Sequence, residues 1–378
     1  MTAPGRAGST GAVDVFLNVT ALDDNPFPAL WTAAVRAAGG RVQHFGLRTV
    51  LRRRRAGRGW VQLQWPEWCL GGGRAAAATG LLRLLGLCLV ARLLGHRLLL
   101  TVHNVRGHRR EHVLLETLMW RVLGRLATHV HCFTAAGAAE VAALLPSTRR
   151  ATGVVIPHGD YGPVLGPVPS RAAARAELGL TGAGRVLLVF GKLQAYKGIT
   201  ALLTAFASVP GADVRLLVRG APADEATAAL LREAAARDPR IDLEARYLSQ
   251  AELTTAVAAA DLVVLPYARV TNSGSALLAL SVGRAVLLPR TPVFEELQGR
   301  CGPRWVRLSA GAPGARDLVG TVGAPADDER PDLGWCSWDA VADDLRALLG
   351  TGTGTDTGTA GTPSTATAVR LPGAMAER

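Results

Sequence analysis

The chain has 378 residues, 49% of them hydrophobic, which is enough to bury the cores of two domains of ordinary size. Its formal net charge of +12 comes entirely from residues 1–160, where 20 arginines stand against 8 acidic residues, because residues 161–378 hold 22 of each sign. A basic half predicts an anionic partner such as an acidic membrane or a lipid diphosphate. No nucleic acid is expected, because no RNP, zinc-finger or helix-turn-helix signature accompanies the charge.

Strand-like and helix-like segments alternate along the first 160 residues, after a polar N-terminus, residues 1–12, that we expect to be disordered. The strand-like segments are 13–19, 42–46, 60–65, 97–104, 129–134 and 152–159, and the helix-like segments are 25–40, 75–95, 111–126 and 135–145. This rhythm predicts an open parallel α/β sheet.

The most apolar segment of the chain is 81–100, but three arginines and a histidine interrupt it. Its longest uncharged run is far below the roughly 20 residues that span a bilayer. We therefore predict a helix that faces the core of an α/β layer and is followed by a strand. The alternative is a helix that lies on a membrane surface.

A passage rich in proline and glycine, residues 157–170, predicts a connection to a second α/β series. The strand-like segments of that series are 185–191, 213–220, 241–249, 261–267, 284–289 and 305–309, and its helix-like segments are 197–208, 223–237, 250–260, 274–282 and 292–298. We predict an α/β protein with two Rossmann-like domains, residues 13–165 and 166–335, facing across a cleft. A last helix at 336–350 and a disordered, Thr/Gly-rich tail at 351–378 complete the prediction.

The five cysteines are scattered and include no C-x-x-C pair, which favours a reducing compartment over a disulfide framework. The N-terminus shows no apolar core of a secretory signal. We therefore predict a cytoplasmic protein. The basic half extends this prediction to a peripheral position on the inner face of the plasma membrane.

The stretch GKLQAYKG contains Lys192 and Lys197, the only two lysines of the chain. It follows a predicted strand directly and opens a predicted helix, whose N-terminus carries positive partial charge. Ligands of open α/β sheets bind at the carboxyl ends of the strands. The pair therefore predicts a diphosphate-sized anion site, and the alternative is a solvated lysine pair.

The stretch TNSGS likewise leads from a predicted strand into a predicted helix. Gly274 lets an anion approach the backbone, and the side chains of Thr271, Asn272, Ser273 and Ser275 can hold phosphate oxygens together with the first-turn amides. The alternative is an ordinary cap of a helix N-terminus. We expect this loop and the lysine loop to face the same cleft.

Polar side chains follow three predicted strands of the N-terminal half: Glu67, then His103 with Asn104, and then His158. Each side chain follows a strand, where residues that line a ligand-binding cleft are expected. A single residue at such a position more often has a structural role than a catalytic one. The segment HRREH at 108–112 has the H-x-x-E-H spacing of some zinc sites. Its two arginines oppose a dication, so we expect no metal and assign the segment to an anionic or sugar acceptor.

These motifs resemble those of GT-B-fold glycosyltransferases, closest to family 4 and its β-mannosyltransferase-like relatives. The specific matches are FGKLQAYKG, RLLVRG, RYLSQAEL, ADLVVLPY, TNSGSALLALSVGRAVLLP and SWDAVADDL, and the weaker ones are NPFPALW, QWPE, TVHN and IPHGDY. The resemblance spans residues 13–350. It implies a C-terminal domain that binds a sugar nucleotide and a last helix that crosses back to the N-terminal domain.

The resemblance implies the roles of the donor-binding residues, and the polar residues of the basic half supply the candidates for the acceptor side and, if the reaction inverts, for the base. Those expected to bind the donor are Lys192, Lys197, Arg219, Arg246, Thr271, Asn272, Ser273, Gly274, Ser275 and Glu296. The candidate catalytic bases are Glu67, His103 and Glu111, and the candidate acceptor-binding residues are Asn104, Arg106, His108 and His158. The arginines of 51–58, with Arg106, Arg109 and Arg110, would hold a lipid-linked diphosphate.

The sequence departs from family 4 at two glutamates that usually stand eight residues apart around the TNSGS loop. Val270 and Leu278 occupy these positions. The second glutamate normally holds the ribose, so we expect that contact to come from Glu295 or Glu296. The departure also leaves open whether the reaction inverts or retains the anomeric configuration.

The expected activity is transfer of a sugar from a nucleoside diphosphate, GDP-mannose or a UDP-sugar, to the hydroxyl of a lipid-linked glycan in polysaccharide or glycolipid synthesis. Lys192, Lys197 and the amides of 273–275 would stabilise the departing diphosphate, with no metal or other cofactor. Two alternatives stay open. One is a non-catalytic, nucleotide-binding partner subunit, which the missing glutamates motivate, and the other is a sugar-nucleotide epimerase that shares the two-domain fold.

Overall fold

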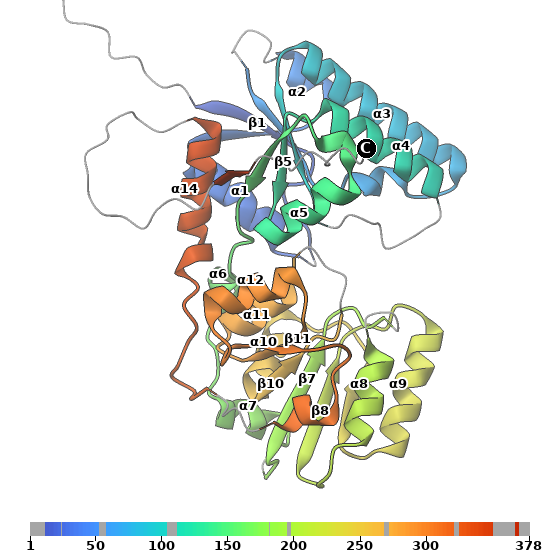
Figure 1. The fold of residues 1–378 in the computed structure, drawn as a ribbon, viewed down its shortest axis with the longest axis vertical. Coiled ribbons are helices and arrows are strands. Elements are labelled where there is room, and N and C mark those ends of the chain that lie inside the picture. The colour runs from blue at the N-terminus through green and yellow to red at the C-terminus, as the bar shows by residue number, and fades with distance from the viewer. Residues whose placement is uncertain are drawn as a thin grey trace, which may run out of the picture. The chain divides into compact units, whose positions relative to one another are not determined.

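The computed structural model describes residues 12–23, 25–52, 58–103, 112–180, 182–194, 198–267, 272–320, 325–350 and 367–369. The chain divides into two compact units (Figure 1). Unit 1 comprises Met1–Gly159 and Trp335–Arg378, and unit 2 comprises Asp160–Gly334.

The sheet of unit 1 has the strand order β13-β6-β5-β4-β3-β1-β2. Its strands are β1 (Val13–Leu17), β2 (Gly40–His44), β3 (Trp60–Leu63), β4 (Arg97–Thr101), β5 (His129–Cys132), β6 (Thr152–Val155) and β13 (Thr367–Val369). Neighbours pair in parallel except β13, which pairs antiparallel with β6. The prediction that the whole tail is disordered was therefore wrong for Thr367–Val369. The open edge of β6 offers unpaired backbone groups, and this short segment pairs with them.

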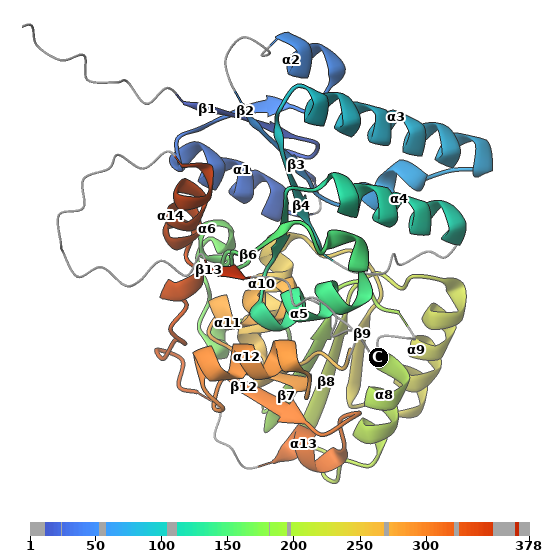
Figure 2. The ribbon, with the colours of Figure 1, turned by 45° about the horizontal axis from the view of Figure 1, so that its top comes forward.

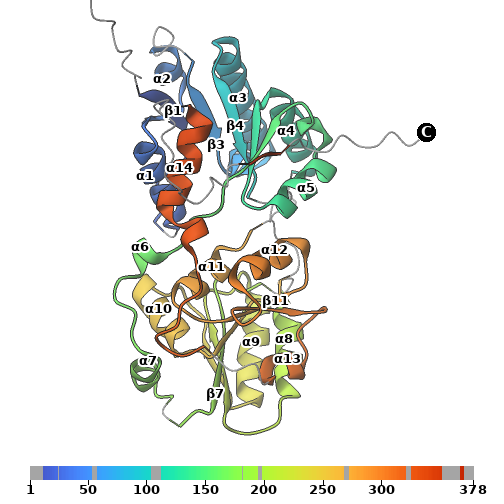
Figure 3. The same ribbon diagram turned by 60° about the vertical axis from the view of Figure 1, so that its left-hand side comes forward.

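Helices cover both faces of this sheet (Figures 2 and 3). On one face, α1 (Phe27–Ala37) packs against α14 (Trp338–Leu349), and Trp31, Val341 and Leu345 are buried between them and the strands. The helices whose buried side chains face the other core are α2 (Leu47–Arg52), α3 (Arg74–Leu93), α4 (Val113–Leu126) and α5 (Ala135–Leu144). The short 3-10 helices in the described part of the unit are η2 (Pro66–Leu70), η3 (Pro146–Thr148) and η5 (Gly334–Cys336), the last of which begins at the final residue of unit 2.

Helix α3 occupies most of the segment 75–95 and is followed by β4, as predicted. Its residues Leu81, Cys88 and Ala91 are buried in the core. Among the described residues it is the one helix long and apolar enough to cross a membrane, by length and composition alone. Only 22% of its most apolar stretch is buried, so much of this apolar helix faces away from the core.

Unit 2 has a six-stranded parallel sheet with the order β12-β11-β10-β7-β8-β9. Its strands are β7 (Arg185–Phe190), β8 (Val214–Arg219), β9 (Ile241–Glu244), β10 (Leu262–Val264), β11 (Val286–Pro289) and β12 (Val306–Ser309). Its helices are α6 (Gly162–Leu165), α7 (Arg171–Glu177), α8 (Ile199–Ala207), α9 (Glu225–Arg237), α10 (Gln250–Ala259), α11 (Gly274–Ser281), α12 (Pro292–Cys301) and α13 (Ala315–Val319). The strands β7, β10 and β11 are buried on both faces, which explains why they read as nearly continuous runs of Val and Leu in the sequence.

Side chains at the helix N-termini fix where many of these helices begin. A Ser, Thr or Asp oxygen accepts a hydrogen bond from a first-turn amide at Thr134, Ser170, Asp224, Ser249, Ser273, Thr291 and Ser337. Each bond satisfies a donor that has no partner within its own helix.

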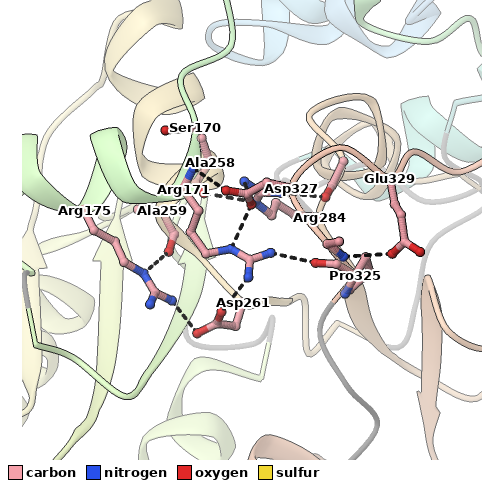
Figure 4. A network of polar contacts seen from close by, with 12 residues as sticks. Ser170, Arg171, Arg175, Ala258, Ala259, Asp261, Arg284, Pro325, Asp327 and Glu329 are labelled. Atoms are coloured by element: carbon pink, nitrogen blue, oxygen red, sulfur yellow. Dashed lines mark hydrogen bonds and ion pairs between the residues drawn. The ribbon is translucent and has the colours of Figure 1, made fainter.

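An ion network in unit 2 joins segments that are far apart in the sequence (Figure 4). Asp261, just before β10, accepts from Arg175 at 2.5 Å and lies 3.4 Å from Arg171. Asp327 lies 3.3 Å from Arg171 Nε and 3.1 Å from Arg284 Nη2. The network therefore ties α7 and the segment around Asp327 to the amino-terminal end of β10.

Candidate active site

The sheet of unit 2 has a point at which the chain reverses its direction of travel across the sheet. From the central strand β7, the strands β8 and β9 extend to one side, and β10, β11 and β12 extend to the other. The loops that follow β7 and β10 diverge at this point, which is where open α/β sheets bind ligands. Lys192 follows β7, and Ser273 lies in the connection from β10 to α11.

Two glycines bring the carboxyl ends of β7 and β8 close together. Gly191 and Gly220 have φ angles of +101° and +142°. A Cβ atom added to Gly220 would lie 1.9 Å from the Gly191 carbonyl oxygen, so a larger residue does not fit there. Lys192 comes directly after this turn and has an exposed side chain. Its charge is therefore carried at the carboxyl edge of the sheet.

The N-terminus of α11 lies beside the same turn. Ser273 Oγ accepts from the Ala276 amide at 3.1 Å and shares a 2.6 Å hydrogen bond with the Tyr267 hydroxyl. A Cβ atom added to Gly191 would be 4.0 Å from Ser275 Oγ, which places the β7 turn next to the first turn of α11. Burial raises the pKa of Tyr267, which therefore stays neutral and acts as a hydrogen-bonding group.

The N-terminus of α8 approaches the segment after β10. Gly198, the residue before α8, has a φ of +80°, and a Cβ atom there would lie 2.6 Å from the Pro266 carbonyl oxygen. The edge of the sheet near β7 and β10 thus carries two helix N-termini and the side chain of Lys192. Helix N-termini favour anions because of their free amides and their dipole, so this arrangement can hold a phosphate or diphosphate.

Other residues predicted to bind the donor have structural partners in unit 2. Arg219 is 4% exposed and is bonded to Asp242 at 2.7 Å, with Glu244 at 3.4 Å. Arg246 is bonded to Glu244 at 2.5 Å and to Glu252 at 2.6 Å. These ion pairs were not visible in the sequence, and donor contacts from either arginine stay a prediction.

The remaining donor candidates are placed as follows. Glu296 lies on α12, and its carboxylate is 4.0 Å from Arg300 one turn later. Asn272 precedes the capping serine of α11. Lys197 and Thr271 lie outside the described residues.

Unit 1 has its own point of strand reversal, between β1 and β3. After β1, Asn18 Nδ2 donates to the Gln64 carbonyl oxygen at 2.7 Å, and the Gln64 amide donates to Asn18 Oδ1 at 2.8 Å. His103, after β4, donates from Nε2 to Gln64 Oε1 at 3.1 Å. These contacts bring together the carboxyl ends of three strands. The sequence reasoning missed Asn18 and Gln64, although the rule that ligands bind at strand ends applies to both.

An aromatic stack continues from this cluster. Trp65 is the one described non-glycine residue with a positive φ, at 45°. Its ring stacks on His103, with centroids 3.9 Å apart, and on Trp68, with centroids 5.1 Å apart. Trp68 is 52% exposed. A strained backbone at a strand end is a frequent property of functional sites, and this one aims a broad aromatic surface outward.

Glu67, in η2, and two histidines at the same edge of the sheet have shifted pKa values. Burial raises its pKa from 4.5 to about 7, and the nearby charge of Glu116 acts in the same direction. Burial, together with His158 and His131, lowers the pKa of His103 well below its usual value. Burial also lowers the pKa of His158 to about 4. The two histidines are therefore neutral near pH 7, whereas Glu67 can exchange a proton there.

The other predicted residues of the N-terminal half lie outside the described residues. They are Asn104, Arg106, His108, Arg109, Arg110, Glu111 and most of the arginine-rich segment 51–58. Within the part of unit 1 that is described, the structure brings Glu67, His103 and His158 to the carboxyl edge of one sheet. No group of three His, Cys, Asp or Glu side chains that could hold a metal occurs among the described residues of the chain.

Comparisons with known proteins agree with this arrangement. The family described as glycosyl transferases group 1 matches residues 184–310. GDP-mannose:glycolipid 4-beta-D-mannosyltransferase of Xanthomonas campestris pv. campestris is 31% identical over 293 residues, which cover 74% of this chain and 76% of the relative.

Two solved structures show the same fold at low sequence identity. HepE of Anabaena, in complex with UDP-glucose, has a TM-score of 0.63 and 14% identity, covering 89% of this chain and 99% of that one. Sucrose-phosphate synthase of Thermosynechococcus elongatus has a TM-score of 0.58 and 16% identity, covering 89% and 94%.

Two Rossmann-like units and a last helix that returns to unit 1 define an enzyme of the GT-B class. The chain belongs to the glycosyl transferases group 1 family and is a glycosyltransferase. The predicted fold class and enzyme class are confirmed. The family match favours sugar transfer over the epimerase and the non-catalytic subunit.

Proposed function

We propose that the enzyme transfers a mannosyl group from GDP-mannose to a hydroxyl of a glycolipid. The 31% identical relative, a GDP-mannose:glycolipid 4-beta-D-mannosyltransferase, supports this donor and this class of acceptor. The observation that supports the proposal is the arrangement at the carboxyl edge of the unit 2 sheet, where the Lys192 turn lies next to the capped N-terminus of α11. We assign donor binding to unit 2 and acceptor binding to unit 1.

The leaving group of this reaction is a nucleoside diphosphate, whose departure builds negative charge. Lys192, Lys197 and the amides of 273–275 would stabilise that charge as it develops, without a metal. Ser273 is held by Tyr267 and by its own cap bond, so the first turn of α11 is ordered before the donor binds. Such preorganisation lowers the barrier, because little rearrangement is needed in the transition state.

A β-linked product formed from an α-linked donor requires inversion, and inversion requires a base for the acceptor proton. Glu67 is the candidate whose pKa, about 7, is matched to this role. The neutral His103 and the exposed ring of Trp68 lie along the same stack and would position the acceptor sugar. A glycolipid acceptor in polysaccharide or glycolipid synthesis would bring the enzyme to the inner face of the plasma membrane as a peripheral protein.

The proposal is tested first by donor binding. A thermal-shift panel of GDP-mannose, UDP-glucose and a dTDP-sugar should show the largest rise in melting temperature with GDP-mannose. The K192A variant should bind GDP-mannose at least about tenfold more weakly, because a cation beside the diphosphate is lost. R237A, which removes an exposed charge on α9, is the matched control and should bind as the wild type does.

The second test is turnover with a radiolabelled donor and an extracted glycolipid. Label in the lipid fraction that depends on both the enzyme and GDP-mannose is the expected result. Equal donor binding by K192A and the wild type would remove Lys192 from the site. A clear preference for a UDP-sugar in both tests would show that the donor is a UDP-sugar and not GDP-mannose.

A further inference from the structure

The outer face of α3 is apolar where a helix of an α/β layer is usually charged. Leu82, Leu89 and Leu93 recur at helical spacing on one exposed side of the helix, away from the buried Leu81 and Cys88. Leu82 is 72% exposed and Leu93 is 78% exposed. Over its 20 residues α3 contains no acidic residue, and its charged residues are three arginines.

The neighbouring helix α4 continues this face. The two helices pack against each other and lie side by side on unit 1 (Figure 2). Val113, Leu114 and Leu118 are exposed at the start of α4, and Leu114 is 86% exposed. Further along, Arg121 and Arg125 occupy the same outer side of the helix.

We define the α3–α4 face by these exposed side chains: Leu82, Arg83, Leu89, Leu93, Val113, Leu114, Leu118, Arg121 and Arg125. Of the eleven large hydrophobic side chains that are exposed in the described part of the chain, six belong to it, whereas unit 2 contributes one. Apolar side chains gathered in this way mark an interaction surface.

The charges of the α3–α4 face indicate the kind of partner. Its three exposed ionic side chains are all arginines, and they stand beside leucines. Arginine can lay its apolar stem along lipid while its guanidinium reaches phosphate, and leucines on the same face can enter the acyl boundary. A soluble protein partner would not require a face whose charges are all positive. In a symmetric dimer through this face, the arginines of the two copies would repel each other.

We propose that the α3–α4 face docks onto the surface of a bilayer that contains anionic phospholipid. This inference extends the proposed function. It depends on that function in one respect only, namely that a glycolipid acceptor lies in a membrane. The helices lie flat, with the leucines in the interface and the arginines at the phosphates. Unit 1, which we assign to the acceptor, is thereby held at the layer where that acceptor resides.

The test is co-sedimentation of the full chain with vesicles, in the absence of donor. Vesicles of phosphatidylcholine with phosphatidylglycerol should bind the protein, and vesicles of phosphatidylcholine alone should bind much less. The double variant L82Q/L114Q should lower the partition coefficient about tenfold or more, because two leucines no longer enter the interface. R83Q/R121Q should remove the preference for phosphatidylglycerol, and added salt should have the same effect on the wild type.

The controls separate docking from folding and from donor binding. L144Q removes an exposed leucine on α5, outside the α3–α4 face, and should bind vesicles as the wild type does. L82Q/L114Q should keep the wild-type melting temperature and bind GDP-mannose normally. K192A should bind the donor weakly and bind vesicles as the wild type does. If GDP-mannose proves not to be the donor, the test of vesicle binding by the α3–α4 face therefore still stands.

Three outcomes would overturn the proposal. One is equal vesicle binding by L82Q/L114Q and the wild type, and a second is no binding to either kind of vesicle. The third is a concentration-dependent dimer in analytical ultracentrifugation that L82Q/L114Q abolishes while vesicle binding is unchanged. That last result would assign the α3–α4 face to a second copy of the chain.

Discussion

Replacing Glu67 with glutamine should change how the stability of unit 1 depends on pH. The pKa of Glu67 is about 7 in the folded chain and 4.5 in the reference state, chiefly because of burial. A carboxyl group whose pKa is raised on folding contributes stability that is fully present below pH 4.5 and is lost as the pH rises through 7. At about 1.4 kcal/mol per pKa unit, the loss over the full range is at most about 3.5 kcal/mol, and less where water reaches the carboxyl group.

The measurement is urea unfolding at pH 5 and pH 8, followed by tryptophan fluorescence. Seven of the eight tryptophans belong to unit 1, so this signal reports that unit. The wild type should lose about 2 to 3 kcal/mol of unfolding free energy between the two pH values beyond the loss shown by E67Q, which cannot ionise. E140Q, an exposed change on α5, should behave as the wild type does.

The same variants test the role of Glu67 in transfer. E67Q should lower turnover by about a hundredfold or more if the carboxylate takes the acceptor proton, with little change in donor affinity. Identical pH slopes for E67Q and the wild type would refute the argument that this carboxyl group is held protonated by burial. A normal turnover number for E67Q would refute its assignment as base.

Three further predictions concern unit 2. S273A should cost about 1 kcal/mol of stability through the lost cap, as S337A should in α14, but only S273A should also weaken GDP-mannose binding, measured by calorimetry. G220A should lower the melting temperature strongly, because its Cβ would lie 1.9 Å from a backbone oxygen. At Gly179 an added Cβ meets no atom, so G179A should lower the melting temperature only slightly, through the strain of its positive φ. D261N should cost about 3 kcal/mol in urea unfolding, because the arginines around it lose a charged partner, and donor affinity in the folded variant should stay normal.

Much of the fold could be predicted, because short sequence patterns indicate the alternating strands and helices. Buried strands appear as runs of Val and Leu, and serine or threonine caps mark the starts of helices. Parallel strands share one carboxyl edge, so the loops around Lys192 and Ser273 could be placed at that edge. The short strand β13 could not be predicted, because its partner β6 lies more than two hundred residues earlier in the chain.

The parts of the site that sequence reasoning missed depend on long-range contacts and on backbone angles. Nothing local indicates that Trp65 adopts a positive φ, which is rare for a bulky residue. The Asn18–Gln64 pair joins residues 46 positions apart. Arg219 follows the family pattern in the sequence, but its ion pair with Asp242 becomes apparent only when β8 and β9 pair.

The position of α14 has a consequence for how the chain is made. Unit 1 is discontinuous, because its last helix is synthesised only after all of unit 2. Until then, the surface on which Val341, Ala342 and Leu345 pack stays open beside α1, whereas unit 2 is complete once residue 334 has left the ribosome. Unit 2 can therefore complete its core during synthesis, whereas the core of unit 1 can be completed only after residues 335–350 have been made.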